Sequence, residues 1–253
     1  MIKEFWPGAS WRWPLSYLDR VMISENYIRR LKHPWDVKIP LMLDSGAYSL
    51  ILAHGTYPFP LIDYANDIRI WQPLVAWTMD YPCEPSIRAK WNFTTKEAQA
   101  RTNENTIELN DRYQAGVASV VQGYEVSGYL ENLDLIKERG LLTERLGIGT
   151  LCRRGQNELI AEIVRAIYDN VPRWVRLHGF GMKISALRTE ASQYLYSTDS
   201  SAWAWDWHQK GKQHRMAGTY YGIDGKLTDL RKYLAKIDEI SRWDQKMITE
   251  VAS

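Results

Sequence analysis

The sequence predicts an α/β fold of parallel strands, and more specifically a (β/α)₈ TIM barrel. Short apolar runs alternate with amphipathic segments of helical length, which is the order of βα units. Six such units can be counted in 253 residues, close to the usual length of this barrel, and one or two irregular units remain unplaced. Phosphate-binding glycine motifs are absent from the sequence, so a doubly wound open sheet is the second choice.

The predicted strands are short apolar runs that end at a polar residue or a glycine. They are Pro40–Leu43, Leu74–Met79, Val117–Val121, Leu146–Ile148, Val175–Leu177 and Tyr194–Tyr196. In a (β/α)₈ barrel the carboxyl ends of the strands share one face, so the residues that follow these runs are expected to meet.

Amphipathic segments between these runs predict helices over Thr94–Gln114, Ser127–Gly140 and Asn157–Asn170, and a closing helix over residues 227–250. Thr94 and Glu97 have the spacing of a capping box. We expect a single domain over residues 1–253, with a Trp-rich segment over residues 1–38 and without a zinc subdomain.

The composition, 45% hydrophobic and 25% charged, is that of a globular protein and excludes a disordered chain. No apolar run approaches the roughly 18 residues of a membrane span, and the N-terminus lacks a signal-peptide pattern. Cys83 and Cys152 form neither a disulfide framework nor a zinc spacing. We therefore expect a cytoplasmic protein with no membrane partner. The net charge of +2 permits a nucleic-acid partner without requiring one.

Twelve tryptophans are the unusual feature of the composition, and many fall in "FWPGASWRWP" and "SSAWAWDWHQ". Tryptophan in such polar stretches has two interpretations. The side chains either pack around the rim of a core, or offer flat surfaces on which nucleic-acid bases stack.

Polar residues follow the predicted strands one after another. They are Asp44, Asp80, Gln122-Gly123, Gly149-Thr150, His178-Gly179 and Asp199. Each has a structural alternative: the aspartates can form turns or helix caps, and His178 can be a core histidine. The recurrence of acidic residues at one face favours a catalytic site.

Six motifs in this order resemble those of the tRNA-guanine transglycosylase superfamily. They are "LDSGAYS", "MDYPCEP", "VVQGY", "LGIGTLC", "RLHGFG" and "STDSSAW", between Leu43 and Trp203. The resemblance implies a (β/α)₈ barrel that exchanges guanine in a nucleic acid for a 7-deazaguanine base. Asp199 then corresponds to the nucleophile and Asp44 to the general acid/base.

The same resemblance implies a pocket for the purine. The expected base-binding residues are Ser45, Tyr48, Asp80, Gln122, Gly149, Thr150, His178 and Gly179. Asp80 would accept hydrogen bonds from N1 and N2 of guanine, while Gln122 and the backbone at Gly149-Thr150 would serve O6. Tyr48 and His178 would stack on the base. Gly46 and Gly179 would leave room for the ring.

The chain also departs from the tRNA enzymes. It lacks their zinc ligands, and "SSAWAWDWHQ" replaces the segment that engages the anticodon loop. Short zinc-less relatives resemble the DpdA-type DNA transglycosylases of bacteria and phages, which insert 7-cyano-7-deazaguanine (preQ0) or a related base into DNA. Expected DNA contacts are Arg153, Arg154, Lys183, Trp203 and Trp205.

The expected partners are DNA and a free 7-deazaguanine base, with no metal or other cofactor, and the oligomeric state stays open. Three alternatives remain. The chain could be a transglycosylase of tRNA or other RNA, a nucleic-acid-binding barrel without turnover, or a glycoside hydrolase. The last would also need paired carboxylates but would leave Asp80 and Gln122 without a purpose.

Overall fold

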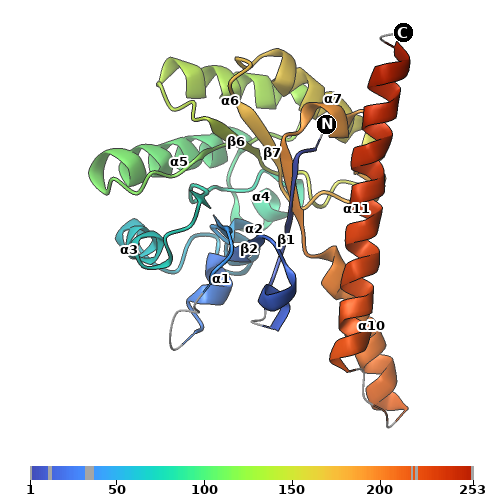
Figure 1. Cartoon of the computed structure of the whole chain (residues 1–253). Coiled ribbons are helices and arrows are strands. Elements are labelled where there is room, and N and C mark those ends of the chain that lie inside the picture. Colours follow the sequence, from blue (N-terminus) through green and yellow to red (C-terminus); the bar gives the residue numbers. More distant parts are fainter. Residues whose placement is uncertain (1, 11–12, 32–36, 218, 220–221, 252–253) are drawn as a thin grey trace.

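The strands of the computed structural model run parallel to their neighbours and form two sheets (Figure 1). Residues 2–10, 13–31, 37–217, 219 and 222–251 are described. The larger sheet has the order β1 (Glu4–Pro7), β8 (Ser197–Ser200), β7 (Arg176–Gly179), β6 (Arg145–Ile148) and β5 (Ser119–Val121). The smaller has the order β2 (Val21–Ser24), β3 (Leu41–Asp44) and β4 (Val75–Ala76).

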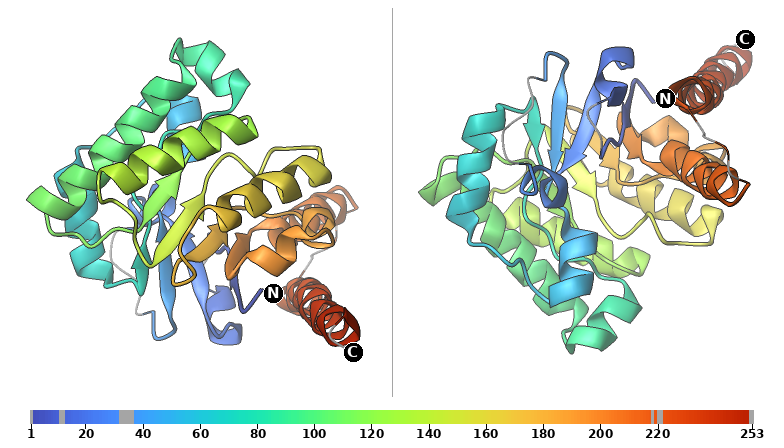
Figure 2. Two further views of the ribbon diagram at one scale, coloured as in Figure 1. Left: turned by 90° about the horizontal axis from the view of Figure 1, so that it is seen from above. Right: turned by 90° about the horizontal axis from the view of Figure 1, so that it is seen from below.

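Two isolated parallel bridges join the sheets. Gly8, just after β1, pairs with Met22 of β2, and Trp77, just after β4, pairs with Ala118 just before β5. Helices α3, α5, α6 and α7 lie outside the strands (Figure 2). The predicted α/β class with parallel strands is confirmed. The closed (β/α)₈ barrel stays a prediction, because the ladders divide into two sheets, and within the described residues these sheets are joined by two single residue pairs.

Helices connect most of the strands. They are the 3₁₀ helix η1 (Trp13–Tyr17), α1 (Glu25–Ile28), α2 (Ala47–His54), α3 (Leu61–Trp71), α4 (Pro85–Trp91), α5 (Thr95–Ile107), the π-helical turn η2 (Glu108–Arg112), α6 (Val126–Glu138), α7 (Asn157–Asp169), α8 (Ile184–Leu187), α9 (Ala191–Tyr194), α10 (Ala202–Met216) and α11 (Ile223–Val251). The helices predicted over 94–114, 127–140 and 157–170 correspond to α5 with η2, α6 and α7. The closing helix is α11.

The strands separate an inner cluster of side chains from the outer core, because alternate residues of a strand face opposite sides. In β3, Met42 belongs to the inner cluster, whereas Leu41 and Leu43 pack outside. The inner cluster consists of Trp6, Met22, Met42, Val75, Trp77, Ala118 and Val120, with Phe180 against it. A Cβ at Gly147 would lie 2.5 Å from Phe180 Cε2, so this glycine makes room for the inner aromatic side chains.

Three strands differ from the prediction. The runs that form β1 and β2 lay within the Trp-rich segment and were not predicted. The strand expected over Tyr194–Tyr196 begins at Ser197 instead, because Tyr194 belongs to α9. Asp199 therefore lies within β8 rather than after a strand.

Removal of the α5 cap tests the capping box. Thr94 Oγ1 accepts a hydrogen bond from the backbone N–H of Glu97, and the Glu97 carboxylate accepts one from the backbone N–H of Thr94. We expect Thr94→Ala to lower the free energy of unfolding by about 1 kcal/mol, because the first turn of α5 loses the side-chain acceptor of a backbone N–H. Urea denaturation measures this, with Thr95→Ala as the control outside the cap. Equal effects of the two variants would contradict the assignment.

Candidate active site

Three aspartates lie at the carboxyl ends of the strands and are close enough for their charges to interact. Asp44 ends β3, Asp80 follows β4, and Asp199 lies near the end of β8. Burial, with the negative charges of Asp80 and Asp199, raises the pKa of Asp44 to about 7. The structure therefore brings together the two carboxylates predicted to be catalytic and the one predicted to bind the base.

Asp44 is held by the loop that follows its own strand and by the neighbouring strand β2. Its carboxylate accepts hydrogen bonds from the Gly46 backbone N–H and the Ser24 hydroxyl, and both lower its pKa against the larger effect of burial. Gly46, not the Asp44 side chain, occupies the N-cap of α2. The helix-cap alternative for Asp44 is therefore excluded.

Asp80 is the centre of a buried network of hydrogen bonds. Ser45 Oγ donates to Asp80 Oδ1 at 2.9 Å, and Gln122 Nε2 donates to Asp80 Oδ2. The Tyr57 hydroxyl lies 3.0 Å from Ser45 Oγ and 2.8 Å from the Asp80 carbonyl oxygen. Burial raises the pKa of Asp80 to about 6, and the Ser45 and Gln122 hydrogen bonds oppose this rise.

The Gln122 amide links Asp80 to the loop after β6. Its Oε1 accepts a hydrogen bond of 2.7 Å from Thr150 Oγ1. Thr150 has a left-handed backbone with φ of 55°, which is uncommon for a β-branched residue. Its Oγ1 also accepts from the Cys83 N–H at 2.9 Å, and this second bond ties the strained residue to the loop after β4.

Asp199 contacts β7 and the loop that follows it. Its Oδ1 accepts a hydrogen bond of 2.8 Å from the Gly181 N–H, and it lies 3.3 Å from Nε2 of His178. The other imidazole nitrogen, Nδ1, lies 2.9 Å from Ser197 Oγ. His178 is fully buried, so the candidate nucleophile contacts an imidazole that is closed to solvent.

The prediction that His178 stacks on the base is wrong. Its ring centroid lies 4.8 Å from the rings of both Trp77 and Phe180, and these neighbours belong to the inner cluster. The ring is therefore covered by protein side chains. Its edge, rather than its face, points to the site through Nε2.

At three glycines of the motifs, protein atoms take the space that a Cβ would need. For Gly46 and Gly179 this replaces the predicted room for the substrate ring, whereas Gly149 was predicted to contact O6 through its backbone. A Cβ would lie 2.9 Å from Ser24 Oγ at Gly46, 2.2 Å from Gln122 Nε2 at Gly149, and 3.0 Å from Met182 Cγ at Gly179. The Gly149 N–H donates to the Val121 carbonyl, and its own carbonyl accepts from the Tyr129 hydroxyl. Its backbone is therefore not directed at O6 of a bound guanine.

The predicted phosphate contacts differ in exposure. Arg154 is buried: its guanidinium donates to the carbonyls of Thr150 and Tyr124, so its assignment as a DNA contact is wrong. Arg153 is exposed, and its guanidinium carbon lies 4.9 Å from the ring centroid of Tyr48. Lys183 is exposed and donates to the Arg154 carbonyl.

Of the two tryptophans predicted to contact DNA, Trp203 is part of the core. It is 1% exposed, and its indole N–H donates to the Gly8 carbonyl at 3.1 Å. A base therefore has no access to its ring, and the prediction is wrong. The Trp205 side chain lies outside the described residues.

Sequence reasoning missed three residues of the site. Ser24 lies at the end of β2, a strand that was not predicted. Tyr57 lies in the α2–α3 connection, where no motif marked it. Glu84 is buried at 7% exposure within "MDYPCEP", and burial raises its pKa. For Glu84 a signal existed, since it is a second carboxylate in the same motif as Asp80, one residue before the end of that motif.

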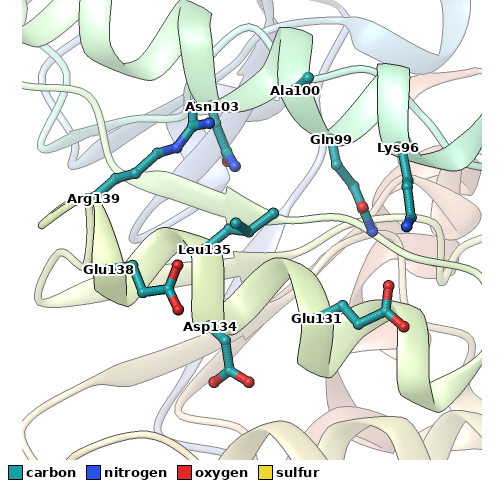
Figure 3. Close-up of a pocket in the computed structure, with 9 residues that line it drawn as sticks. All are labelled: Lys96, Gln99, Ala100, Asn103, Glu131, Asp134, Leu135, Glu138 and Arg139. Atoms are coloured by element: carbon teal, nitrogen blue, oxygen red, sulfur yellow. The ribbon is translucent and has the colours of Figure 1, made fainter.

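Two surface hollows lie away from these carboxylates. The larger, of about 410 Å³, lies between α5 and α6, and its lining includes Lys96, Gln99, Glu131 and Arg139 (Figure 3). The other, of about 310 Å³, adjoins it and shares Lys96, Gln99 and Glu131. Neither is lined by Asp44, Asp80 or Asp199, so the chemistry is argued from the carboxylates.

Within the described residues, no group of three or more His, Cys, Asp or Glu side chains is arranged to hold a metal ion. Nor is any described helix both long enough and apolar enough to cross a bilayer.

Fold and site together define a class. Parallel strands carry acidic side chains at their carboxyl ends, and one carboxylate has a pKa near neutrality beside a second that is in contact with a histidine. Carboxylates with perturbed pKa values gather at functional sites, so this end of the strands is the candidate active site.

A comparison of the sequence with models of protein families identifies the family of this chain. The model described as "DpdA: DeoxyPurine in DNA protein A" matches residues 18–245. Because the match covers most of the chain, the chain belongs to the DpdA family, and this membership indicates a transglycosylase-type enzyme related to DNA modification. A search of curated proteins found no match.

The raised pKa of Asp44 predicts a pH-dependent effect of Asp44→Asn on stability. A carboxyl with a folded-state pKa of about 7 and an ordinary pKa of 3.8 favours folding below pH 4, and this contribution is lost as the pH rises to about 7. We therefore expect the variant to be as stable as the wild type near pH 4. At pH 8 it should be more stable by a few kcal/mol, since a pKa unit corresponds to roughly 1.4 kcal/mol.

Urea unfolding at pH 4, 6 and 8 measures this difference. The exposed Asp19 supplies the control variant, Asp19→Asn. A stability difference between Asp44→Asn and wild type that does not grow with pH would show that the Asp44 carboxyl is not perturbed by its surroundings.

Proposed function

We propose that the protein exchanges guanine in DNA for a 7-deazaguanine base, preQ0 or a derivative, through a covalent aspartyl-glycosyl intermediate. The observation that carries the proposal is the interaction between two aspartates at the carboxyl ends of the strands. The negative charge of Asp199 helps to raise the pKa of Asp44 to about 7. Family membership supports DNA as the substrate. In this proposal the closed (β/α)₈ barrel is the scaffold, and the two isolated bridges support the closure.

The exchange has two halves. An Asp199 carboxylate oxygen attacks the anomeric carbon C1′ of the deoxyribose, the bond from C1′ to the guanine nitrogen breaks, and Asp44 gives its proton to the departing base. The incoming base then loses a proton to Asp44 and attacks C1′, and the ester electrons return to Asp199. The sugar–phosphate chain stays intact, and the reaction consumes neither a nucleotide nor a redox cofactor.

Asp80 would read the donor edge of the purine. With a pKa of about 6 it is mainly ionised at pH 7 and accepts hydrogen bonds from N1 and N2 of guanine. Ser45 and Gln122 orient the carboxylate. Thr150 in turn orients Gln122, whose amide therefore supports Asp80 rather than serving O6 as the sequence suggested.

The exposed Arg153 and Lys183 would supply positive charge to DNA phosphates near the site. Tyr48 would stack on the extruded base. Because the Arg153 guanidinium lies over the Tyr48 ring, the arginine must leave one face of the ring when the base enters that face. The free 7-deazaguanine base is the co-substrate, and no metal is required.

A base-exchange assay tests the function. Purified protein is incubated with preQ0 and either duplex DNA or bulk tRNA, and the nucleosides are digested and identified by mass spectrometry. We expect the deazaguanine deoxynucleoside from DNA alone. Incorporation into tRNA alone would overturn DNA as the substrate, and no product from either, with preQ0 or other 7-deazaguanines, would overturn base exchange.

Replacement of the nucleophile tests the intermediate. We expect Asp199→Asn to lower exchange by at least about 10³-fold, because an amide is a poor nucleophile, and to abolish the DNA–protein adduct seen after denaturation. Circular dichroism and the melting temperature check that the variant is folded. Full activity or an undiminished adduct in the folded variant would remove Asp199 from this role.

Replacement of Asp80 tests base selection. Asp80→Asn presents an N–H₂ group to the donor edge of guanine, so we expect the preference for guanine over hypoxanthine, which lacks the 2-amino group, to fall roughly tenfold or more. Exchange rates of the two labelled free bases measure this preference. An unchanged ratio in a folded variant would place Asp80 outside the base pocket.

A further inference from the structure

The two carboxylate oxygens of Asp199 have different surroundings. Oδ1 accepts the Gly181 N–H at 2.8 Å and faces His178 Nε2 at 3.3 Å. Within the described part of the chain, no hydrogen bond reaches Oδ2. The protein therefore distinguishes one oxygen of the candidate nucleophile from the other.

Ser197 is hydrogen-bonded to one of the two ring nitrogens of His178. It lies two residues before Asp199 on β8, and its Oγ is 2.9 Å from Nδ1. When the hydroxyl donates to Nδ1, the neutral ring carries its proton on Nε2 and points an N–H at Oδ1. The opposite tautomer would direct a nitrogen lone pair at a carboxylate oxygen, which is repulsive.

The imidazole has little freedom to turn away from Asp199. Trp77 and Phe180 lie against it, each with its ring centroid 4.8 Å away, and the residue is fully buried. Nε2 makes no hydrogen bond of good geometry among the described residues. A buried N–H without an acceptor is costly, and such bonds are often long in an unliganded site and shorten during the reaction.

We propose that His178 is a positioning residue that, together with the Gly181 N–H, holds Oδ1 as the non-reacting oxygen of Asp199 and leaves Oδ2 to attack the sugar. The same two donors stabilise the carboxylate when it departs in the second half of the exchange. This inference rests on the proposed function, and it concerns which step the histidine accelerates.

The bonds and charges of the two halves give the expected sign. In the first half the Oδ2–C1′ bond forms, the C1′–base bond breaks, and Oδ1 becomes an ester carbonyl with less negative charge. In the second half the incoming base forms its bond to C1′, the Oδ2–C1′ electron pair returns to the carboxylate, and charge spreads onto Oδ1. Donors to Oδ1 favour the charged form, so they accelerate breakdown of the intermediate more than its formation.

The test measures the covalent DNA–protein adduct at steady state, by denaturing electrophoresis, together with the rate of exchange. His178→Met removes the donor, and Ser197→Ala keeps the ring but removes the hydroxyl that selects its tautomer. His178→Gln keeps a donor. Ser192→Ala is the matched control, since Ser192 is buried and donates to the Thr189 carbonyl in the region of α9, outside the contacts of Asp199.

We expect exchange to fall roughly tenfold or more in His178→Met and Ser197→Ala, while the adduct fraction rises several-fold. His178→Gln should recover part of the rate, and Ser192→Ala should leave both values unchanged. Two results in folded variants would overturn the proposal. Either the adduct fraction and the exchange rate fall together, or both stay at wild-type levels. Where His178→Met fails to fold, Ser197→Ala decides.

Failure of the inference is distinguishable from failure of the proposed function. Without the proposed function, the wild-type protein forms neither product nor adduct. With the function but without the inferred role, the wild type forms both, and the variants fail to shift the balance between them.

Discussion

The placement of carboxylates at one end of parallel strands, largely shielded from water, is the constraint on which the rest of the site depends. Each buried carboxylate loses hydration, and the charges of Asp80 and Asp199 add repulsion at Asp44. The structure offsets this cost with donors from several elements: Ser24 and Gly46 at Asp44, Ser45 and Gln122 at Asp80, and Gly181 at Asp199. Two glycines make room for these donors, since a Cβ at Gly46 would meet Ser24 and one at Gly149 would meet Gln122.

Much of this framework could be predicted from the sequence, because apolar runs reveal strands that are buried on both faces. β3, β4, β5, β6 and β7 were found in this way, together with the polar residues at their ends. β8 could not be found by the same signal, since its four residues, "STDS", are all polar although three of them are buried. The hydroxyl of one of them is satisfied by the neighbouring strand β7, where Thr198 Oγ1 donates to the Gly179 carbonyl. Hydrophobic patterning does not detect such a strand, and Asp199 was found through its motif alone.

The details of the site were harder to predict because they depend on what fills each space. A glycine in a sequence shows that a side chain is missing, but not whether substrate or protein takes its place. At Gly149 the space is occupied by the Gln122 amide. The same limit applies to Arg153 and Arg154, which are adjacent in the chain but opposite in exposure. The course of the loop buries one guanidinium against backbone carbonyls and leaves the other at the surface.

Asp44 and Asp80 belong to one cluster of carboxylates but suit different roles, proton transfer and hydrogen-bond acceptance. Both are raised above the ordinary aspartate pKa by burial, but the charges of two neighbouring aspartates act on Asp44 in addition, and the result is about 7 against about 6. Near neutral pH, Asp44 is therefore populated in both its protonated and its ionised form, as a proton carrier must be, whereas Asp80 is mainly an anion and can only accept. The difference does not come from residue type, since both are aspartates at strand ends. It comes from the surroundings that the fold gives each carboxylate: the negative charges of Asp80 and Asp199 raise the pKa of Asp44, whereas hydrogen bonds from Ser45 and Gln122 lower that of Asp80.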